Sequence, residues 1–181
     1  MSDEYEDMPV LDVRKVLDSY RTSMELLRRY DEGAIDIPPG SAPEWRLTHH
    51  EAREVIETLC AWFPDDTLFG QERGDGLRSV IETIYQGFAG QELYPSTQEK
   101  AANLLYLVVK DHPLSDGNKR TAAALFVTFL SKNKALRSDD GTALISNNAL
   151  AGVTLMVAMS DPKEKDLMIA LITRMLNREQ K

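Results

Sequence analysis

Residues 111–120 read DHPLSDGNKR, and this polar decapeptide separates two strongly apolar stretches of the chain. The stretches TQEKAANLLYLVVKD (97–111) and KRTAAALFVTFLSKN (119–133) carry apolar residues over a wide face at helical spacing. We therefore expect two central helices that are joined by a short bend. The bend gathers a histidine, an aspartate, a Gly-Asn pair and two adjacent cations at that junction.

The composition of the bend favours the binding of an anion. His112 ends the first predicted helix, and Asn118, Lys119 and Arg120 begin the second, with a five-residue loop between them. A helix start offers unpaired backbone N–H groups and a partial positive charge, which attract phosphates. Gly117 allows a close approach of the backbone to a ligand. The two cations add full charges, although the chain contains no Walker motif.

Two further side chains of the bend have chemistry that suits group transfer. Asp116 supplies a hard oxygen ligand for Mg²⁺, which typically binds one or two carboxylates together with substrate phosphates. A histidine such as His112 can accept a proton from an attacking hydroxyl near neutral pH. The same composition also occurs in ordinary polar turns, so the residues alone leave both interpretations open.

The rest of the chain is helical in pattern nearly throughout. Apolar residues at spacings of three or four predict an amphipathic helix over 10–30, followed by a proline-rich loop over 33–46. Two pairs with capping-box spacing, Thr48 with Glu51 and Ser96 with Glu99, predict helix starts. Further predicted helices occupy 147–159 and 162–178, whereas the glycine-rich segment 65–95 is expected to hold loops and short strands.

Bulk composition excludes several classes of protein. The 181 residues suit one domain, and an apolar fraction of 43% is enough for a hydrophobic core. A net charge of −8 makes a nucleic-acid partner unexpected, although a protein with a negative net charge can still contain a locally positive cleft. The single cysteine, Cys60, cannot form an intrachain disulfide and fits a reducing compartment. Neither a membrane-spanning stretch nor a secretory signal is apparent, so a cytoplasmic location is expected.

Several other residues have simpler interpretations. His49, His50 and Glu54 could begin a metal site, but the sequence places no third ligand beside them, so a solvated helix start is favoured. Trp45 and Trp62 flank a predicted helix and are expected to anchor it. Core packing is expected for Cys60 and for four methionines at helical spacing, namely Met156, Met159, Met168 and Met175.

The stretch HPLSDGNKRTAAALF resembles the signature of the Fic/Doc (Fido) family, H-P-F-x-[DE]-G-N-[GK]-R. The preceding segment GQELYPSTQEKAANLLYLVVKD is similar to death-on-curing-like members, and the whole chain resembles the C-terminal domain of the virulence protein RhuM group. The resemblance implies a single Fido domain over 1–181 with an all-α, Fic-type helical bundle. It also implies a small β-hairpin flap over the active site, expected within 80–94.

Members of that family transfer AMP, or a terminal phosphate, from a nucleoside triphosphate such as ATP to a hydroxyl of a target protein. By resemblance, His112 is the general base, Asp116 holds Mg²⁺ and Arg120 neutralises the phosphates during transfer. The resemblance assigns nucleotide binding to the signature loop and helix start, that is to Gly117, Asn118, Lys119 and Arg120.

The chain departs from the family pattern in ways that affect the expected reaction. Leu114 replaces the usual phenylalanine and is expected to be a core anchor. Ala123 replaces the second arginine of adenylylating members, and Lys119 replaces a glycine, as in the Doc branch. Phosphoryl transfer is therefore favoured over AMP transfer. A catalytically weak Fido-fold interaction or regulatory module is the alternative.

Inhibition is expected to come from outside this chain. Many family members carry an inhibitory helix of pattern [ST]-x-x-x-E-[GN], but here Glu32 and Gly33 match only its end, because Arg28 stands at the first position. The arginine that the glutamate would pair with is absent as well. If the activity is toxic, the resemblance points to a separate antitoxin protein.

Overall fold

The structure, a computed structural model, describes residues 12–177, which form two compact units, 12–35 and 36–177. The first unit consists of α1 (Val13–Ser19) and α2 (Arg21–Asp31). The prediction of helix over 10–30 is confirmed in type, but the helix is interrupted at Tyr20, whose backbone is not helical (φ −114°, ψ 14°). Residues 10 and 11 lie outside the described residues. Neither helix buries a side chain, so the apolar stripe of this segment is exposed.

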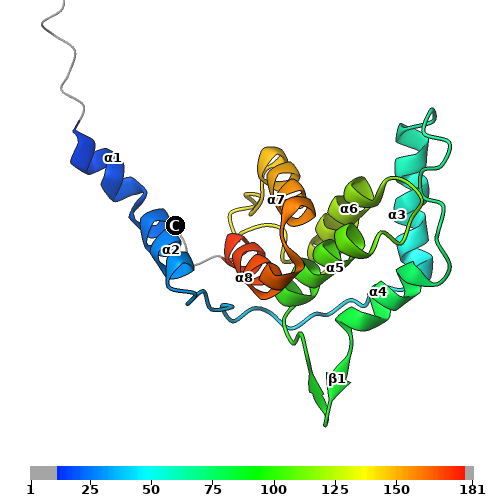
Figure 1. The fold of residues 1–181 in the computed structure, drawn as a ribbon, viewed down its shortest axis with the longest axis horizontal. Coiled ribbons are helices and arrows are strands. Elements are labelled where there is room, and N and C mark those ends of the chain that lie inside the picture. The colour runs from blue at the N-terminus through cyan, green and yellow to red at the C-terminus, as the bar shows by residue number, and fades with distance from the viewer. Residues whose placement is uncertain (1–11, 178–181) are drawn as a thin grey trace, which may run out of the picture. The chain divides into compact units, whose positions relative to one another are not determined.

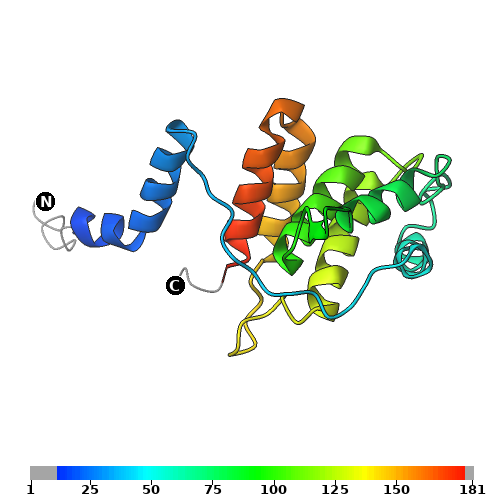
Figure 2. The same cartoon turned by 90° about the horizontal axis from the view of Figure 1, so that it is seen from below.

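The second unit is built around two central helices, as the sequence predicts. They are α5 (Thr97–Asp111) and α6 (Asn118–Lys132), which pack against each other (Figures 1 and 2). Ten of the fifteen residues of α5 are buried, including both alanines at 101 and 102, which allow close helix packing. Helix α3 (His49–Trp62) packs on α6, and α4 (Gly76–Ile84) packs on α5.

Both predicted capping boxes are present. The Thr48 hydroxyl accepts from the backbone N–H of Glu51, and the carboxylate of Glu51 accepts from the backbone N–H of Thr48. Ser96 and Glu99 make the same reciprocal pair at the start of α5. These local bonds satisfy backbone donors that have no partner inside the helix, which is why the start points could be predicted.

The segment 65–95 differs from its prediction because it contains a helix. The apolar residues of α4 recur at spacings of three, one and three, and all are buried: Leu77, Val80, Ile81 and Ile84. Their burial against α5 stabilises a helix despite the β-branched composition that favoured strands. The flap is correspondingly smaller than 80–94. It consists of β1 (Gly87–Phe88) and β2 (Gln91–Glu92), paired antiparallel with Phe88 opposite Gln91.

The C-terminal part consists of α7 (Asn147–Met159), a 3₁₀ turn (Pro162–Glu164) and α8 (Lys165–Met175). Asp161 caps the turn by accepting from the backbone N–H of Lys163, as its position before a proline predicts. Among the methionines, Met168 is buried, but Met159 is 82% exposed and Met175 is 40% exposed, so the core prediction is wrong for these two residues.

The two tryptophans have different environments. Trp45 packs against Phe129 with 6.3 Å between ring centroids, which agrees with an anchoring role. Trp62 is 68% exposed at the end of α3, so the anchoring prediction is wrong there. Cys60 is half-buried, and its Sγ lies 3.5 Å from the Phe69 carbonyl oxygen. Over residues 12–177, none of the helices combines the length and apolar character needed to cross a membrane.

Candidate active site

The bend between α5 and α6 is held by a segment that lies far away in sequence. Residues 69–73, between α3 and α4, run beside residues 113–116 and form isolated β-bridges with them. Three backbone hydrogen bonds join the segments: Arg73 N to Pro113 O (2.8 Å), Ser115 N to Gln71 O (2.8 Å) and Gly70 N to Asp116 O (3.1 Å). The shape of the bend therefore depends on tertiary pairing as well as on its own turn residues.

The side chain of Asn118 also holds the bend. Its Oδ1 accepts from Leu114 N at 2.9 Å, and its Nδ2 donates to Leu114 O at 2.8 Å. Leu114 itself is fully buried, so these two bonds satisfy backbone groups that water does not reach. Because the amide side chain of Asn118 already serves the loop, only its backbone N–H is available for nucleotide binding, which stays a prediction for this residue.

Gly117 is required at the start of α6 for two reasons. Its backbone is left-handed (φ 83°), a conformation that side chains with a β-carbon rarely adopt. A β-carbon at this position would also lie 2.3 Å from Cε2 of Phe69, far inside van der Waals contact. The glycine therefore lets an aromatic ring from the 69–73 segment pack directly onto the backbone of the bend.

The first turn of α6 presents free backbone donors. Gly117 N donates to Asp116 Oδ1 at 2.7 Å, and Thr121 N donates to Gly117 O at 2.9 Å. Within residues 12–177, the backbone N–H groups of 118–120 have no hydrogen-bond acceptor. Lys119 is exposed beside them. Three free N–H groups at a helix start with an adjacent ammonium form a site that favours a phosphate group.

His112 stands at the other side of the bend with its tautomer fixed. It caps α5 in a left-handed conformation (φ 48°, ψ 58°), and its Nδ1 lies 3.0 Å from the carbonyl oxygen of Lys110. Because a carbonyl oxygen only accepts, Nδ1 carries a hydrogen in this contact, which leaves Nε2 as the ring nitrogen without a hydrogen-bond partner among the described residues. The ammonium of Lys110 in turn donates to Ser160 O, just beyond the end of α7.

Asp116 fits a magnesium ion through one carboxylate oxygen. Its Oδ1 is engaged by Gly117 N, while Oδ2 lies 3.7 Å from Nη2 of Arg120 on a side chain that is 46% exposed. Mg²⁺ needs only one or two protein carboxylates when phosphates and waters complete its shell. In the part of the chain that the structure describes, no group of three or more His, Cys, Asp or Glu side chains gathers as a metal site.

Arg120 is oriented by residues that the sequence analysis did not identify. Nη1 of Arg120 lies 2.6 Å from Oδ2 of Asp66, and its guanidinium lies 4.5 Å and 4.6 Å from the ring centroids of Phe63 and Phe69. These residues come from the end of α3 and the loop after it. No local pattern links them to Arg120, so only folding could show that a carboxylate and two rings fix the guanidinium.

His49 has a defined structural role, contrary to the prediction of a solvated helix start. Its Nε2 lies 2.7 Å from Oε1 of Glu72, and Nη1 of Arg53 donates to Gly70 O at 2.7 Å. Both contacts tie α3 to the segment that supports the bend. His50 is exposed and lies 3.6 Å from Glu54, so the prediction holds for that residue.

The fold and the bend together define a helical domain in which two central helices meet at a polar His-to-Arg turn, with a small hairpin before the first of these helices. A family model described as Fic/DOC family matches residues 46–130, from the loop before α3 to the last part of α6. This segment of the chain belongs to the Fic/DOC family, and the expected all-α bundle with a small hairpin is confirmed. The narrower resemblance to the RhuM group stays a prediction.

The chain is also similar to a curated protein, "Toxin Doc" of Mycolicibacterium smegmatis (strain ATCC 700084 / mc(2)155). The two are 50% identical over 51 residues, which is 28% of this chain and 36% of the relative. The matched stretch therefore spans only about a third of the relative's length. No solved structure matches the chain.

Proposed function

We propose that this protein is a Mg²⁺-dependent transferase that moves a phosphoryl group from ATP, or another nucleoside triphosphate, to a hydroxyl of a target protein. The observation that carries the proposal is the pairing of two features across one short loop. One is an imidazole whose Nε2 is free to accept a proton, and the other is a helix start with three unpaired N–H groups and two cations.

In the proposed reaction, the triphosphate binds at the start of α6 through the backbone N–H groups of 118–120 and the charge of Lys119. Nε2 of His112 takes the proton from the target hydroxyl, whose oxygen attacks the γ-phosphorus. The bond from that phosphorus to the bridging oxygen breaks, and the nucleoside diphosphate leaves with the electron pair. Arg120 stabilises the negative charge that develops on the phosphates.

Asp116 would hold the magnesium ion through Oδ2, which is free of backbone contacts. When bound, the ion neutralises phosphate charge and orients the oxygens of the triphosphate. The residues of the chain then have to orient the hydroxyl and the triphosphate, because phosphoryl transfer depends mainly on positioning and charge neutralisation.

Phosphoryl transfer is favoured over AMP transfer because of Ala123. This position faces the groove beside Arg120, whose lining is almost entirely apolar along α6. Position 123 therefore supplies no second cation beside Arg120 to grip the far phosphates in the orientation that AMP transfer needs. Protein adenylylation (AMPylation) is the alternative outcome of the same site.

The proposed partners are a nucleotide and a target protein that presents a hydroxyl, acting in the cytoplasm. The hairpin is the element that would receive an extended segment of the target by strand addition. Because one relative is named Toxin Doc, we extend the proposal to a toxic activity that a separate antitoxin protein restrains.

The proposal is tested with α-labelled and γ-labelled ATP in parallel. The purified protein is incubated with Mg²⁺, one of the labels and a host lysate, and labelled proteins are resolved on a gel. Phosphoryl transfer places only the γ label on protein, whereas AMP transfer places only the α label. If neither label reaches protein, and His112→Ala behaves like the wild type in cells, the proposed function is wrong.

A second candidate function is a non-catalytic interaction or regulatory module. It is favoured by the engagement of Arg120 with Asp66 and its approach to Asp116, which leave the guanidinium partly neutralised. In that case Mg-ATP should bind poorly. A calorimetric titration that shows tight Mg-ATP binding, lost in Asp116→Ala, would count against this candidate.

A further inference from the structure

The β-hairpin is held to α5 by a buried cation. Lys100, in the first turn of α5, has an exposed fraction of 0%. Its ammonium donates to Ile84 O at 3.2 Å, to Glu92 Oε1 at 3.2 Å and to Tyr94 O. The three acceptors match the three N–H groups of an ammonium, so the buried charge is fully hydrogen-bonded.

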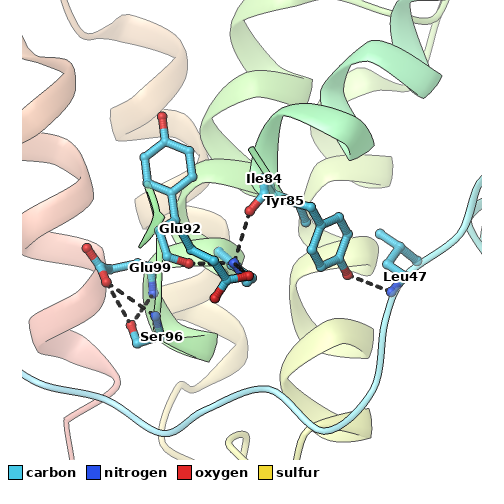
Figure 3. Close-up of polar contacts among 8 residues, drawn as sticks. Leu47, Ile84, Tyr85, Glu92, Ser96 and Glu99 are labelled. Atoms are coloured by element: carbon cyan, nitrogen blue, oxygen red, sulfur yellow. Dashed lines mark hydrogen bonds and ion pairs between the residues drawn. The ribbon is translucent and has the colours of Figure 1, made fainter. Parts of the chain in front are cut away.

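The three acceptors lie on both sides of the hairpin. Ile84 is the last residue of α4, just before the hairpin, Glu92 lies on β2, and Tyr94 follows β2. Figure 3 shows Ile84 and Glu92 bonded to the same group, and Figure 1 shows the hairpin extending from this point. One ammonium therefore ties the incoming chain, the returning chain and one strand to a central helix.

Tyr85 extends this anchor to the loop before α3. Its ring centroid lies 5.4 Å from the Lys100 ammonium and 3.8 Å from Cζ of Arg46. Its hydroxyl accepts from Leu47 N at 2.7 Å, as Figure 3 shows. Burial is the largest cause of the raised pKa of Tyr85, which keeps the phenol neutral beside the two cations.

General stability is a poor explanation for a charged residue at this position. The ammonium of Lys100 loses its water on burial, whereas the Glu92 side chain is 49% exposed, so the attraction between the two charges does little to offset that cost. The hairpin itself has strands of two residues each, and an isolated two-stranded ribbon of that length does not hold its position. The Lys100 ammonium bonds both ends of the ribbon and can therefore hold it in a position that the two short strands could not maintain by themselves.

We propose that Lys100 is a positioning residue that fixes the hairpin relative to His112, the C-cap residue of the same helix. His112 follows Lys100 by twelve positions, which corresponds to about 18 Å along the axis of α5 at about 1.5 Å per residue. Helix α5 thus acts as a rigid spacer between the anchored hairpin and the proposed base. The anchoring of the hairpin does not depend on the proposed function. Its catalytic consequence, the placement of the target hydroxyl, rests on the proposed function.

The anchor is tested by amide hydrogen exchange in Lys100→Met, which keeps the length of the side chain and removes its charge. The reporter is the amide of Leu93, which donates to Gln86 O at 3.0 Å across the hairpin. Its protection should fall by about tenfold to a hundredfold, because hydrogen bonds from a charged group are lost. Amides of α6 and α8 should keep wild-type protection after correction for the free energy of unfolding in urea.

Two further variants keep the test decisive. Glu92→Gln retains an acceptor for Lys100 but removes the opposite charge, so it should lower the exchange protection of the Leu93 amide to a smaller extent. This variant should stay folded even if Lys100→Met does not fold. Lys132→Met removes an equal charge from the exposed end of α6 and should leave Leu93 unchanged. Unchanged protection of Leu93 in both Lys100→Met and Glu92→Gln, or an equal loss in all helices, would overturn the anchor.

The catalytic consequence has its own readout. Once a labelled target is identified, Lys100→Met should raise KM for that target while the Kd of Mg-ATP stays at the wild-type value. A loose hairpin with an unchanged KM would overturn the positioning role. If the wild-type protein transfers no label at all, the proposed function fails, and the exchange measurement still decides whether Lys100 anchors the hairpin.

Discussion

Arg120 and Asp66, which are 54 positions apart, form an ion pair with 2.6 Å between Nη1 and Oδ2 at the proposed phosphate site. Both side chains are more than a third exposed, so the pair itself adds little to stability. Its consequence is positional: together with the rings of Phe63 and Phe69, it gives the guanidinium one defined orientation.

Replacing Asp66 should separate nucleotide binding from turnover. Asp66→Asn removes a negative charge near the proposed site, so the Kd of Mg-ATP, measured by calorimetry, should fall about twofold to fivefold. Turnover in the γ-label assay should fall as well, because Arg120 loses its charged partner. The matched control is Asp65→Asn, an equal charge change at an exposed neighbour, which should alter neither quantity. Weaker binding in Asp66→Asn would contradict this account.

Gly117→Ala should destabilise the protein more than the same change at another left-handed glycine. Gly117 and Gly141 have nearly equal φ values of 83° and 84°, but a β-carbon at 141 would meet nothing within 4 Å. Gly141→Ala should therefore cost about 1 kcal/mol of backbone strain, and Gly117→Ala about 1–3 kcal/mol more from the clash with Phe69. Urea unfolding of both variants measures the difference. Equal losses of unfolding free energy in the two variants would show that the Phe69 ring moves aside at little cost, which would contradict the prediction.

Asn118→Ala should loosen the bend, because Leu114 would lose partners for both of its backbone groups. We expect a loss of about 1–3 kcal/mol in the free energy of unfolding, since buried polar groups are left unsatisfied. The control is Asn148→Ala, at an exposed position of α7, which should stay within about 0.5 kcal/mol of wild type. A loss no larger than that of the control would mean that water replaces the Asn118 amide.

Tyr85 should make stability depend on alkaline pH. Its pKa is raised in the folded protein, chiefly by burial, so the folded state holds the phenol proton more tightly than the unfolded state. This contribution is fully present below the unfolded pKa of about 10 and is lost as pH rises toward the folded value. The free energy of unfolding, measured with urea between pH 8 and 11, should therefore fall less steeply with pH in Tyr85→Phe than in the wild type. Parallel curves for the two proteins would contradict the prediction.

The order of the helices and the location of the bend were determined by local sequence. Capping boxes at Thr48 and Ser96 act within one helical turn, and the composition of 112–120 identified a histidine, a carboxylate and a cationic helix start in one short segment. Such signals depend on neighbours a few residues away, so they can be recognised in the sequence without knowledge of the tertiary structure. Helix α4 was missed because its stability comes from packing against α5 rather than from intrinsic propensity.

Only the tertiary structure decided which side chains hold the site in place. Asp66 and Phe69 reach Arg120 from a loop some fifty positions earlier, and Lys100 bonds the two sides of the hairpin. These contacts join residues that have no periodic relationship in the chain, because each partner is selected by the geometry of helix packing. A buried lysine between alanines and a capping glutamate looks like a solvated helix residue in the sequence. Folding places its charge beneath the hairpin, where the three acceptors stabilise it.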